Sequence, residues 1–190
     1  MRFIALIFIA ALTAFPAFAK PDPYFEAASR NLNFREADSY ANYSDKRGIE
    51  VGVEKLDKKA MKRLLGNDTG KFKLFEVAIT NNSNFRVYIN RIDINNANGG
   101  PYAAVDLSEV VDAIDPGGSG NKDDMRDAVL RTNILNKSLP HAILNPSETA
   151  QGLLYVKDKH LNGDTVLYLQ IQNLKRVAHL DFTVPLDTVK

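Results

Sequence analysis

Three histidines, His141, His160 and His179, are the first residues of this chain that could act as general acids, general bases or metal ligands. Each lies in a different segment, and none belongs to an H-x-x-x-H or H-E-x-x-H spacing, which would place two imidazoles on one face of a helix. His179 alternates with the apolar Leu180 and Phe182, which predicts an exposed position on a strand. His160 lies beside a predicted turn. A shared histidine site is therefore not expected.

Four aspartates, Asp112, Asp115, Asp123 and Asp124, flank a glycine-rich segment and could offer oxygen ligands to a calcium ion. Their spacing does not match the D-x-[DN]-x-[DN]-G-x₅-E pattern of a calcium loop. Aspartates in the first turn of a helix also suit the helix dipole, so we interpret the four as the end of one helix and the start of the next. No metal and no other cofactor is expected.

The glycine run GGSG at residues 117–120 precedes a predicted helix, an arrangement that could bind phosphate. It lacks the Lys-Ser/Thr pair of a P-loop and does not follow a buried strand, so we interpret it as a linker. The sequence contains neither the G-x-S-x-G nor the G-x-G-x-x-G pattern. It also has no cysteine, which excludes thiol catalysis and cysteine-based metal sites. We therefore predict that the protein is not an enzyme.

The remaining possibility is that the protein binds a partner through its surface. The main candidate contact residues lie in the N-terminal segment. Its aromatic residues are interleaved with charged ones, as expected of a segment that docks onto a protein partner. The same residues could instead pack an arm against its own domain and cover a sheet. The sequence leaves both interpretations open. The candidate partner contacts are Tyr24, Phe25, Phe34, Tyr40 and Tyr43.

The first 19 residues, MRFIALIFIAALTAFPAFA, have the charged start, apolar centre and A-x-A end of a secretory signal peptide. The apolar run from Phe3 to Leu12 is short for a membrane span, so we expect cleavage after Ala19 and no stable span afterwards. This predicts a periplasmic protein, with secretion as the second choice. Loss of Arg2 brings the 24 basic residues to 23, equal to the 23 acidic ones. A neutral chain gives no support for a nucleic-acid partner.

From Gly48 onward, apolar residues alternate at a period of two, which predicts β-strands. Asp57 and Gly66 are the expected N-cap and C′ residues of a short helix after the first strand. A phase slip within RVYINRIDI indicates a β-bulge. The predicted strands cover residues 49–56, 72–80, 86–94, 151–157, 164–172 and 177–184.

A helical insertion is expected at about residues 105–139, with one helix at 107–114 and a longer one that Asn121 could cap. It is a second candidate contact surface, because insertions on a rigid scaffold often carry function. The positions that recur at three- and four-residue steps in the longer helix are Met125, Ala128, Val129, Thr132 and Leu135.

The stretch Asn81-Asn82-Ser83-Asn84 fits the N-x-[ST] glycosylation pattern, as do Asn42, Asn67 and Asn136. Because this stretch lies between two predicted strands and its polar side chains can satisfy the local backbone, we interpret it as a hairpin turn. Asn162-Gly163 gives a second hairpin signal between two later strands.

Strands joined by short turns and interrupted by helices predict an antiparallel β-sandwich. The predicted fold class is mainly β, an immunoglobulin-like antiparallel β-sandwich of about seven strands with the helical insertion between the third and fourth strands. The domain is expected to span residues 48–190, with residues 20–47 as an N-terminal arm. Without disulfides, its stability must come from the hydrophobic core.

Four stretches, GIEVGVEKL, FEVAITNNSNFRVYINRIDI, ILNPSETAQGLLYV and DFTVPL, occur in that order over residues 48–186. In this order they resemble a group of uncharacterised bacterial periplasmic proteins and lipoproteins with a single immunoglobulin-like β-sandwich domain. Val156 stands where that group often has phenylalanine. The resemblance implies the fold and an envelope location, and it brings no catalytic motif.

Our hypothesis from the sequence is a non-enzymatic exported envelope protein. It would act as a protein-interaction or accessory module of a periplasmic or secretion-related assembly. The alternative is a small-ligand or carbohydrate-binding protein, or an enzyme, with a site built from loops at one end of the sandwich. A deep polar pocket favours the alternative, whereas exposed apolar residues on the arm or insertion favour the module.

Overall fold

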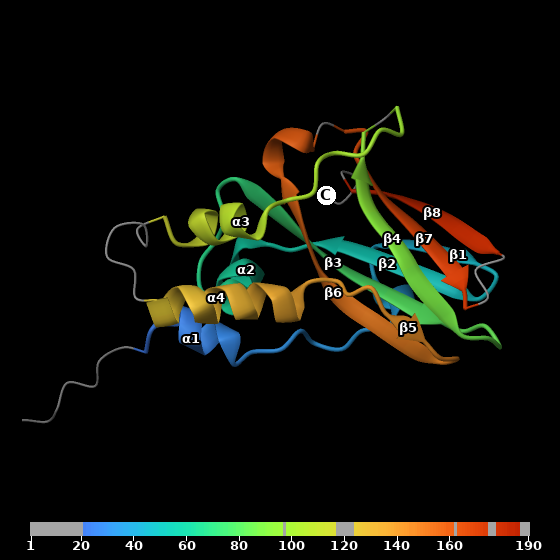
Figure 1. Cartoon of the computed structure of the whole chain (residues 1–190), viewed down its shortest axis with the longest axis horizontal. Coiled ribbons are helices and arrows are strands. Elements are labelled where there is room, and N and C mark those ends of the chain that lie inside the picture. The colour runs from blue at the N-terminus through green and yellow to red at the C-terminus, as the bar shows by residue number, and fades with distance from the viewer. Residues whose placement is uncertain (1–20, 97, 117–123, 162, 175–177, 187–190) are drawn as a thin grey trace, which may run out of the picture.

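The computed structural model describes residues 21–96, 98–116, 124–161, 163–174 and 178–186 of the chain. The expected signal peptide, residues 1–19, and the glycine run at 117–120 lie outside this part. Two β-sheets lie against each other, and helices pack at one end of them (Figure 1). Among the described residues, no helix is both long enough and apolar enough to cross a membrane.

Each sheet has four antiparallel strands, which confirms a mainly β fold. Sheet A has the strand order β1-β2-β3-β6, and sheet B has the order β5-β4-β7-β8. The strands are β1 Asn42–Lys46, β2 Ile49–Lys55, β3 Phe72–Asn81, β4 Val87–Asn95, β5 Ile143–Leu144, β6 Glu148–Lys157, β7 Val166–Asn173 and β8 His179–Pro185.

The helices are α1 Pro23–Ala28, α2 Lys58–Leu65, α3 Leu107–Ile114 and α4 Asp124–Lys137, with short 3₁₀ helices η1 Ala37–Ser39 and η2 Asp158–His160. The caps predicted for α2 are confirmed. The Asp57 carboxylate accepts from the Ala60 N–H at 2.6 Å, and Gly66 ends the helix with a φ of 87°. That left-handed conformation is one that glycine adopts without steric cost.

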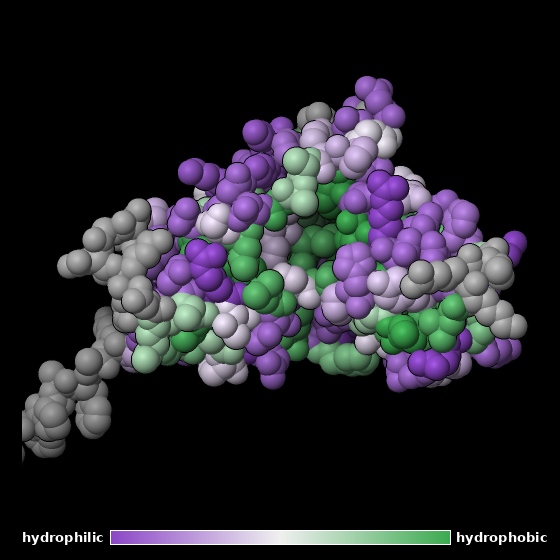
Figure 2. All heavy atoms as spheres, viewed as in Figure 1, coloured by the Kyte–Doolittle hydropathy of each residue, from purple (hydrophilic) through white to green (hydrophobic). Residues whose placement is uncertain are grey.

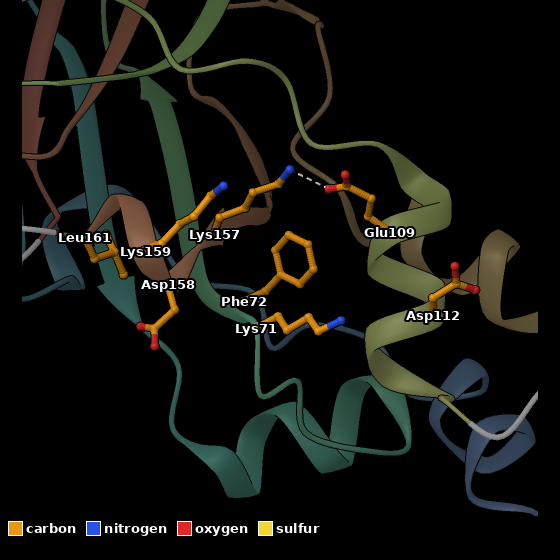
Figure 3. A pocket seen from close by; sticks show the side chains of 8 residues that line it. All are labelled: Lys71, Phe72, Glu109, Asp112, Lys157, Asp158, Lys159 and Leu161. Atoms are coloured by element: carbon orange, nitrogen blue, oxygen red, sulfur yellow. Dashed lines mark ion pairs between the residues drawn. The ribbon is translucent and has the colours of Figure 1, made fainter.

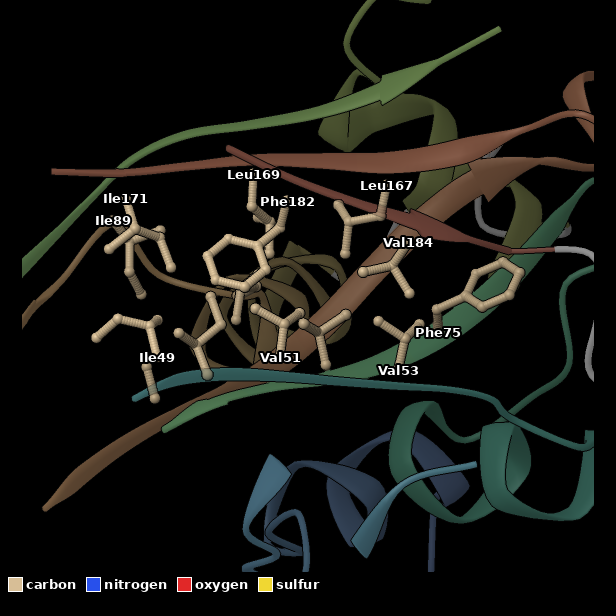
Figure 4. Close-up of a cluster of buried hydrophobic side chains, with 14 of the residues drawn as sticks. Ile49, Val51, Val53, Phe75, Ile89, Leu167, Leu169, Ile171, Phe182 and Val184 are labelled. Atoms are coloured by element: carbon tan, nitrogen blue, oxygen red, sulfur yellow. The ribbon is translucent and has the colours of Figure 1, made fainter. Parts of the chain in front are cut away.

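Apolar side chains from the inner faces of both sheets meet between them and form the main core (Figure 4). On β2 these are Ile49, Val51 and Val53, the alternate residues that the sequence predicted. Burial of such side chains stabilises the fold by about 1.5–3 kcal/mol each. The pairing of β4 with β7 shifts register between Ile89 and Arg91, which confirms the predicted bulge.

The central strand β3 is buried on both faces. Its inner residues Phe75, Val77 and Ile79 belong to the main core. On its outer face, Phe72 and Leu74 lie in a second core, which the helices share. Farther along the same outer face, the N-terminal arm covers the strand, so sheet A is enclosed between sheet B and a layer made of helices and arm.

The arm, residues 20–47, contains more regular structure than expected. It begins with helix α1 and ends in strand β1, which the sequence does not predict. The sequence of β1, NYSDK, has no alternating apolar pattern because the strand lies at the edge of sheet A and pairs with β2 through its backbone. With β1 counted, helices α3 and α4 follow the fourth strand instead of the third.

The turn after β3 does not form the predicted hairpin. The next strand, β4, belongs to the other sheet, so residues 82–86 carry the chain from sheet A to sheet B. The buried Asn81 amide donates to the main-chain oxygens of Phe85 at 2.9 Å and Leu144 at 3.1 Å. Its Oδ1 accepts from the Ser83 N–H at 3.1 Å. The polar residues thus satisfy the local backbone as expected, and a buried side chain with these bonds has no room for a sugar.

The second predicted hairpin, at Asn162-Gly163, is also wrong. Strands β6 and β7 lie in different sheets, and the 3₁₀ helix η2 follows β6 directly. Asn162 itself lies outside the described residues, whereas Gly163 has a φ of 89°, a conformation that suits a turn. In both places the turn residues were recognised, but local turn chemistry does not determine which sheet the following strand joins.

Candidate functional site

A cleft of about 810 Å³ opens between α3 and the end of sheet A, where β3 begins and β6 ends (Figure 3). Phe72, which is buried, forms part of its floor. Lys71 and Lys157 line the sheet side, and Glu109 lies opposite on α3. The sequence could not indicate this cleft, because its walls come from three segments that are far apart in the chain.

One ion pair spans the mouth of the cleft. The Lys157 ammonium lies 2.6 Å from the Glu109 carboxylate, above Phe72 in the view of Figure 3. About half of the Glu109 side chain is exposed, so the pair contributes about 0–1 kcal/mol to stability. An anionic ligand could therefore replace Glu109 beside Lys157 at little cost to the fold. Lys71 and Lys159 add two further ammonium groups to the lining, and Asp112 and Asp158 add two carboxylates that balance them in formal charge.

The histidines do not share a site. The ring of His160 stacks on Tyr102 beside the cleft, with 4.0 Å between ring centroids and 6° between ring planes. Burial, followed by the charges of Lys159 and Lys157, lowers the pKa of His160. A smaller hollow of about 190 Å³ opens at this stack, and Figure 2 shows a hollow with an apolar floor in the same region of the molecule.

The other two histidines have separate partners. The His141 Nδ1 lies 3.1 Å from the main-chain oxygen of Ile89, and the exposed His179 lies 3.6 Å from the Asp181 carboxylate. The exposure of His179 on β8 confirms its predicted position. Within the described residues, no group of three or more histidine, aspartate or glutamate side chains is arranged to hold a metal ion.

Three of the four aspartates near the glycine run lie within the described residues. Asp115 ends α3, as predicted, and its carboxylate lies 3.4 Å from Arg126 on α4. Asp112 lines the cleft. Asp124 begins α4, and Asp123 lies outside the described residues, as does the predicted helix cap Asn121.

Two of the five aromatic candidates in the arm are buried in the protein's own fold. Tyr24 donates from its hydroxyl to the main-chain oxygen of Ile114 at 3.2 Å, which ties α1 to α3. Tyr40 donates to the Glu76 carboxylate at 3.1 Å on the outer face of β3. Burial, followed by the charge of Glu76, raises the pKa of Tyr40. These two residues therefore anchor the arm and do not face solvent.

The other three candidates remain exposed. The exposed fractions are 40% for Phe25, 69% for Phe34 and 46% for Tyr43. They are distributed along the arm, with Phe25 on α1 and Tyr43 on β1. The arm thus alternates between anchors that hold it against sheet A and the helices, and aromatic side chains that it presents to solvent.

Helix α4 shows a feature that the sequence interpretation missed. Its core face consists of Leu130, Ile134 and the polar Asn133 and Lys137, all buried. The recurring residues that predicted the helix lie mainly on the opposite face. Met125 and Leu135 are 67% and 60% exposed. The spacing predicted a helix correctly, but apolar residues on both faces left its orientation undetermined.

Comparisons with known proteins add little to this geometry. No family model and no curated protein matches the chain. Among solved structures, the X-ray structure of Northeast Structural Genomics Consortium target SoR45 is similar over 72% of this chain and 80% of its own. The sequences are 13% identical and the TM-score is 0.31, so this similarity carries no argument about fold or function.

Proposed function

We propose that this chain is a non-enzymatic, exported protein of the bacterial cell envelope, which acts as an interaction or accessory module of a periplasmic or secretion-related assembly. The observation that carries the proposal is the exposure of Phe25, Phe34 and Tyr43 along an ordered arm. Large aromatic side chains in water gain free energy when a partner covers them. Aromatic residues are also enriched in the cores of protein–protein interfaces.

The way in which the arm is held supports this function. Tyr40 is fixed by Glu76 and by Gln151, whose amide donates to the Tyr40 hydroxyl at 2.9 Å. The Arg35 guanidinium lies 4.0 Å from the centre of the Tyr40 ring, and it also pairs with Glu54 on β2. Because these contacts order the arm in advance, a partner that binds it loses less conformational entropy.

The immunoglobulin-like classification and the periplasmic location belong to the same proposal. They rest on the resemblance of residues 48–186 and on the signal-peptide pattern at residues 1–19. N-terminal sequencing of the protein purified from its native host tests the location. We expect a mature chain that begins at Lys20 in the periplasmic fraction, whereas an intact Met1 in the cytoplasm would contradict the proposal.

The interaction itself is tested by affinity purification of the tagged protein from its native envelope. We expect a stoichiometric protein partner. The matched variants are Phe34→Ser, which removes the most exposed aromatic side chain of the arm, and Leu174→Ser, which removes an exposed apolar side chain elsewhere. If the arm is the contact surface, Phe34→Ser should lose the partner and Leu174→Ser should retain it.

The cleft beside α3 favours a second candidate function, the binding of a small anionic ligand. Its volume lies within the range of about 300–1,000 Å³ that small-molecule sites occupy. Lysine ammonium groups suit carboxylate or phosphate groups, so phosphate esters and acidic sugars are the fitting classes of ligand. Nuclear magnetic resonance titration with inorganic phosphate and with galacturonate tests this function. Shifts confined to the residues around Lys157 would support it, and unchanged spectra would contradict it.

A further inference from the structure

The two sheets meet differently along their two sides. On one side, β1 of sheet A contacts β8 of sheet B. On the other side, β4 and β6 border the hollow of about 190 Å³. Its apolar lining includes Ile92 and Ile94 from β4 and Leu154 and Val156 from β6, which belong to the main core or pack against it. The hollow therefore opens from the surface toward the space between the sheets (Figure 2).

The size and the lining of this hollow suit one apolar ring. A cavity of about 150 Å³ lined by apolar side chains stays dry and binds benzene. The hollow, at about 190 Å³, offers space of the same order. Ala103 and Val105 from the segment before α3 also line it, and the ring stack of Tyr102 and His160 borders it. An aromatic side chain of a ligand would gain free energy by leaving water for this space.

Among the described residues that line the hollow, Asp93 and Lys157 carry formal charges. Adjacent side chains on a strand point to opposite faces of the sheet, so Asp93 points away from its apolar neighbours, and it pairs with Arg91. Burial, followed by the charges of two nearby lysines, lowers the pKa of His160, so its imidazole is neutral at pH 7. Lys157 lines both the hollow and the larger cleft, so the two spaces adjoin at this residue.

The charges where the two spaces adjoin are balanced. The Lys157 ammonium lies 2.6 Å from the Glu109 carboxylate, and the described lining of the cleft contains three lysines and three carboxylates. A ligand with a single charge attracts one member of the Lys157–Glu109 pair and repels the other. An α-amino acid carries an ammonium and a carboxylate on the same carbon atom. Its carboxylate can therefore face Lys157 while its ammonium faces Glu109, so that each charge gains an opposite partner.

We infer that the hollow and the adjoining Lys157–Glu109 pair bind an α-amino acid with a large apolar side chain. The apolar side chain lies in the hollow, the carboxylate lies beside Lys157, and the ammonium lies beside Glu109. This site shares its ion pair with the anion site of the second candidate function, and it adds two requirements, an apolar side chain and a positive charge on the ligand. Because Glu109 is half-exposed, water screens its charge, and we expect a dissociation constant on the order of 100 μM.

Nuclear magnetic resonance titration of the full mature chain with L-phenylalanine measures this binding. We expect saturable shifts at the residues around Ile94 and Lys157. Glycine, phenylacetate and phenethylamine are matched probes, because they lack the ring, the ammonium and the carboxylate, respectively. Glycine should bind at least about 10-fold more weakly, since it buries no ring, and the two probes with a single charge about 3-fold more weakly or less well still. Unchanged spectra at about 10 mM L-phenylalanine, or equal affinities for phenylacetate and L-phenylalanine, would overturn the inference.

Substitutions in the hollow test where the apolar side chain lies. Ile94→Phe fills the hollow and should abolish L-phenylalanine binding, whereas Ile143→Phe, at an exposed position on β5, should retain it. Retention of binding by a folded Ile94→Phe variant would overturn the inference.

The variant Glu109→Gln separates this site from the anion site of the cleft. It should weaken L-phenylalanine binding by about 3-fold, because the ligand ammonium loses its partner, whereas phosphate would bind more tightly if the cleft is an anion site. The fold should tolerate this change, so the test does not depend on the variant in the hollow. L-phenylalanine binding without phosphate binding would support the amino-acid site and contradict the anion site. Phosphate binding alone, or an L-phenylalanine affinity unchanged by Glu109→Gln, would overturn the amino-acid site.

Discussion

The Lys137 ammonium lies 3.1 Å from the main-chain oxygen of Ala27, and this buried hydrogen bond joins the end of α4 to the end of α1. Its second acceptor is the amide oxygen of Asn133, so both of these acceptors are neutral. Burial, followed by the charge of Arg63, lowers the pKa of Lys137 to about 8. A buried lysine thus joins the two helices, and its burial disfavours the charged form of the ammonium group.

This arrangement predicts that stability rises with pH above neutrality. The pKa of Lys137 is lower in the folded chain than its ordinary value of 10.5, so between those values the unfolded chain binds a proton that the folded chain does not. Chemical denaturation should show a gain of about 1–2 kcal/mol between about pH 7.5 and pH 9.5. Lys137→Met should abolish the gain, and Lys62→Met, at an exposed lysine of α2, should retain it. Equal pH profiles for the wild type and Lys137→Met would contradict the assignment.

A substitution at Gly52 tests how closely the arm packs on sheet A. A Cβ atom at this position would collide with the main-chain oxygen of Ala37 and would lie 2.8 Å from the Cδ2 of Tyr40. We expect Gly52→Ala to destabilise the fold by about 1–3 kcal/mol, the usual cost of overpacking. It should also make the arm more sensitive to limited proteolysis. Gly70→Ala is the control, because a Cβ atom there meets nothing within 4 Å. An arm equally resistant in both variants would show that it does not depend on this contact.

A substitution at Asn81 tests what stabilises the segment that connects sheet A to sheet B. Asn81→Ala leaves the main-chain oxygens of Phe85 and Leu144 without their amide donor in a buried position. The expected loss of stability is about 2–4 kcal/mol, measured by urea denaturation. Asn84→Ala, at an exposed position of the same turn, should change stability by less than about 0.5 kcal/mol. Similar losses of stability in both variants would mean that the Asn81 side chain does not specifically stabilise the connection between the two sheets.

Substitution of Glu109 in the ion pair at the cleft should change anion affinity while leaving the stability of the fold nearly unchanged. Glu109→Gln removes the negative partner of Lys157 on a half-exposed side chain, so stability should change by less than about 1 kcal/mol. If the cleft binds anions, their affinity should increase in this variant, because Lys157 loses its internal competitor. Phosphate titrations should give the highest affinity for Glu109→Gln, an intermediate affinity for the wild type and the lowest affinity for Lys157→Ala. Equal phosphate affinities for the wild type and both variants would show that the cleft is not an anion site.

Much of this fold follows from local patterns. Alternating apolar residues such as Ile49, Val51 and Val53 located the strands and their inner faces, and Asp57 and Gly66 located the ends of α2. These signals work because they depend on neighbours within a few residues. The unexpected strand β1 lacks such a signal, because its polar residues pair through the backbone alone.

What the sequence did not determine depends on contacts between distant segments. The turn at Asn81 has the expected chemistry, but whether β4 joins sheet A or sheet B is decided by the pairing of whole strands. The orientation of α4 was undetermined because Leu130 and Leu135 are equally apolar and lie on opposite faces. The cleft brings together Lys71, Glu109 and Lys157, and no linear motif links such residues.

In the proposed function, the arm presents its exposed aromatic residues to a protein partner in the envelope. The most direct measurement is quantitative affinity purification from the native envelope of the wild type, of a Phe25→Ser/Phe34→Ser double variant and of Leu174→Ser. We expect a stoichiometric partner with the wild type and with Leu174→Ser, and its loss with the double variant at unchanged thermal stability. Recovery of the wild-type protein alone, or of the same partner in equal amount with all three proteins, would contradict it.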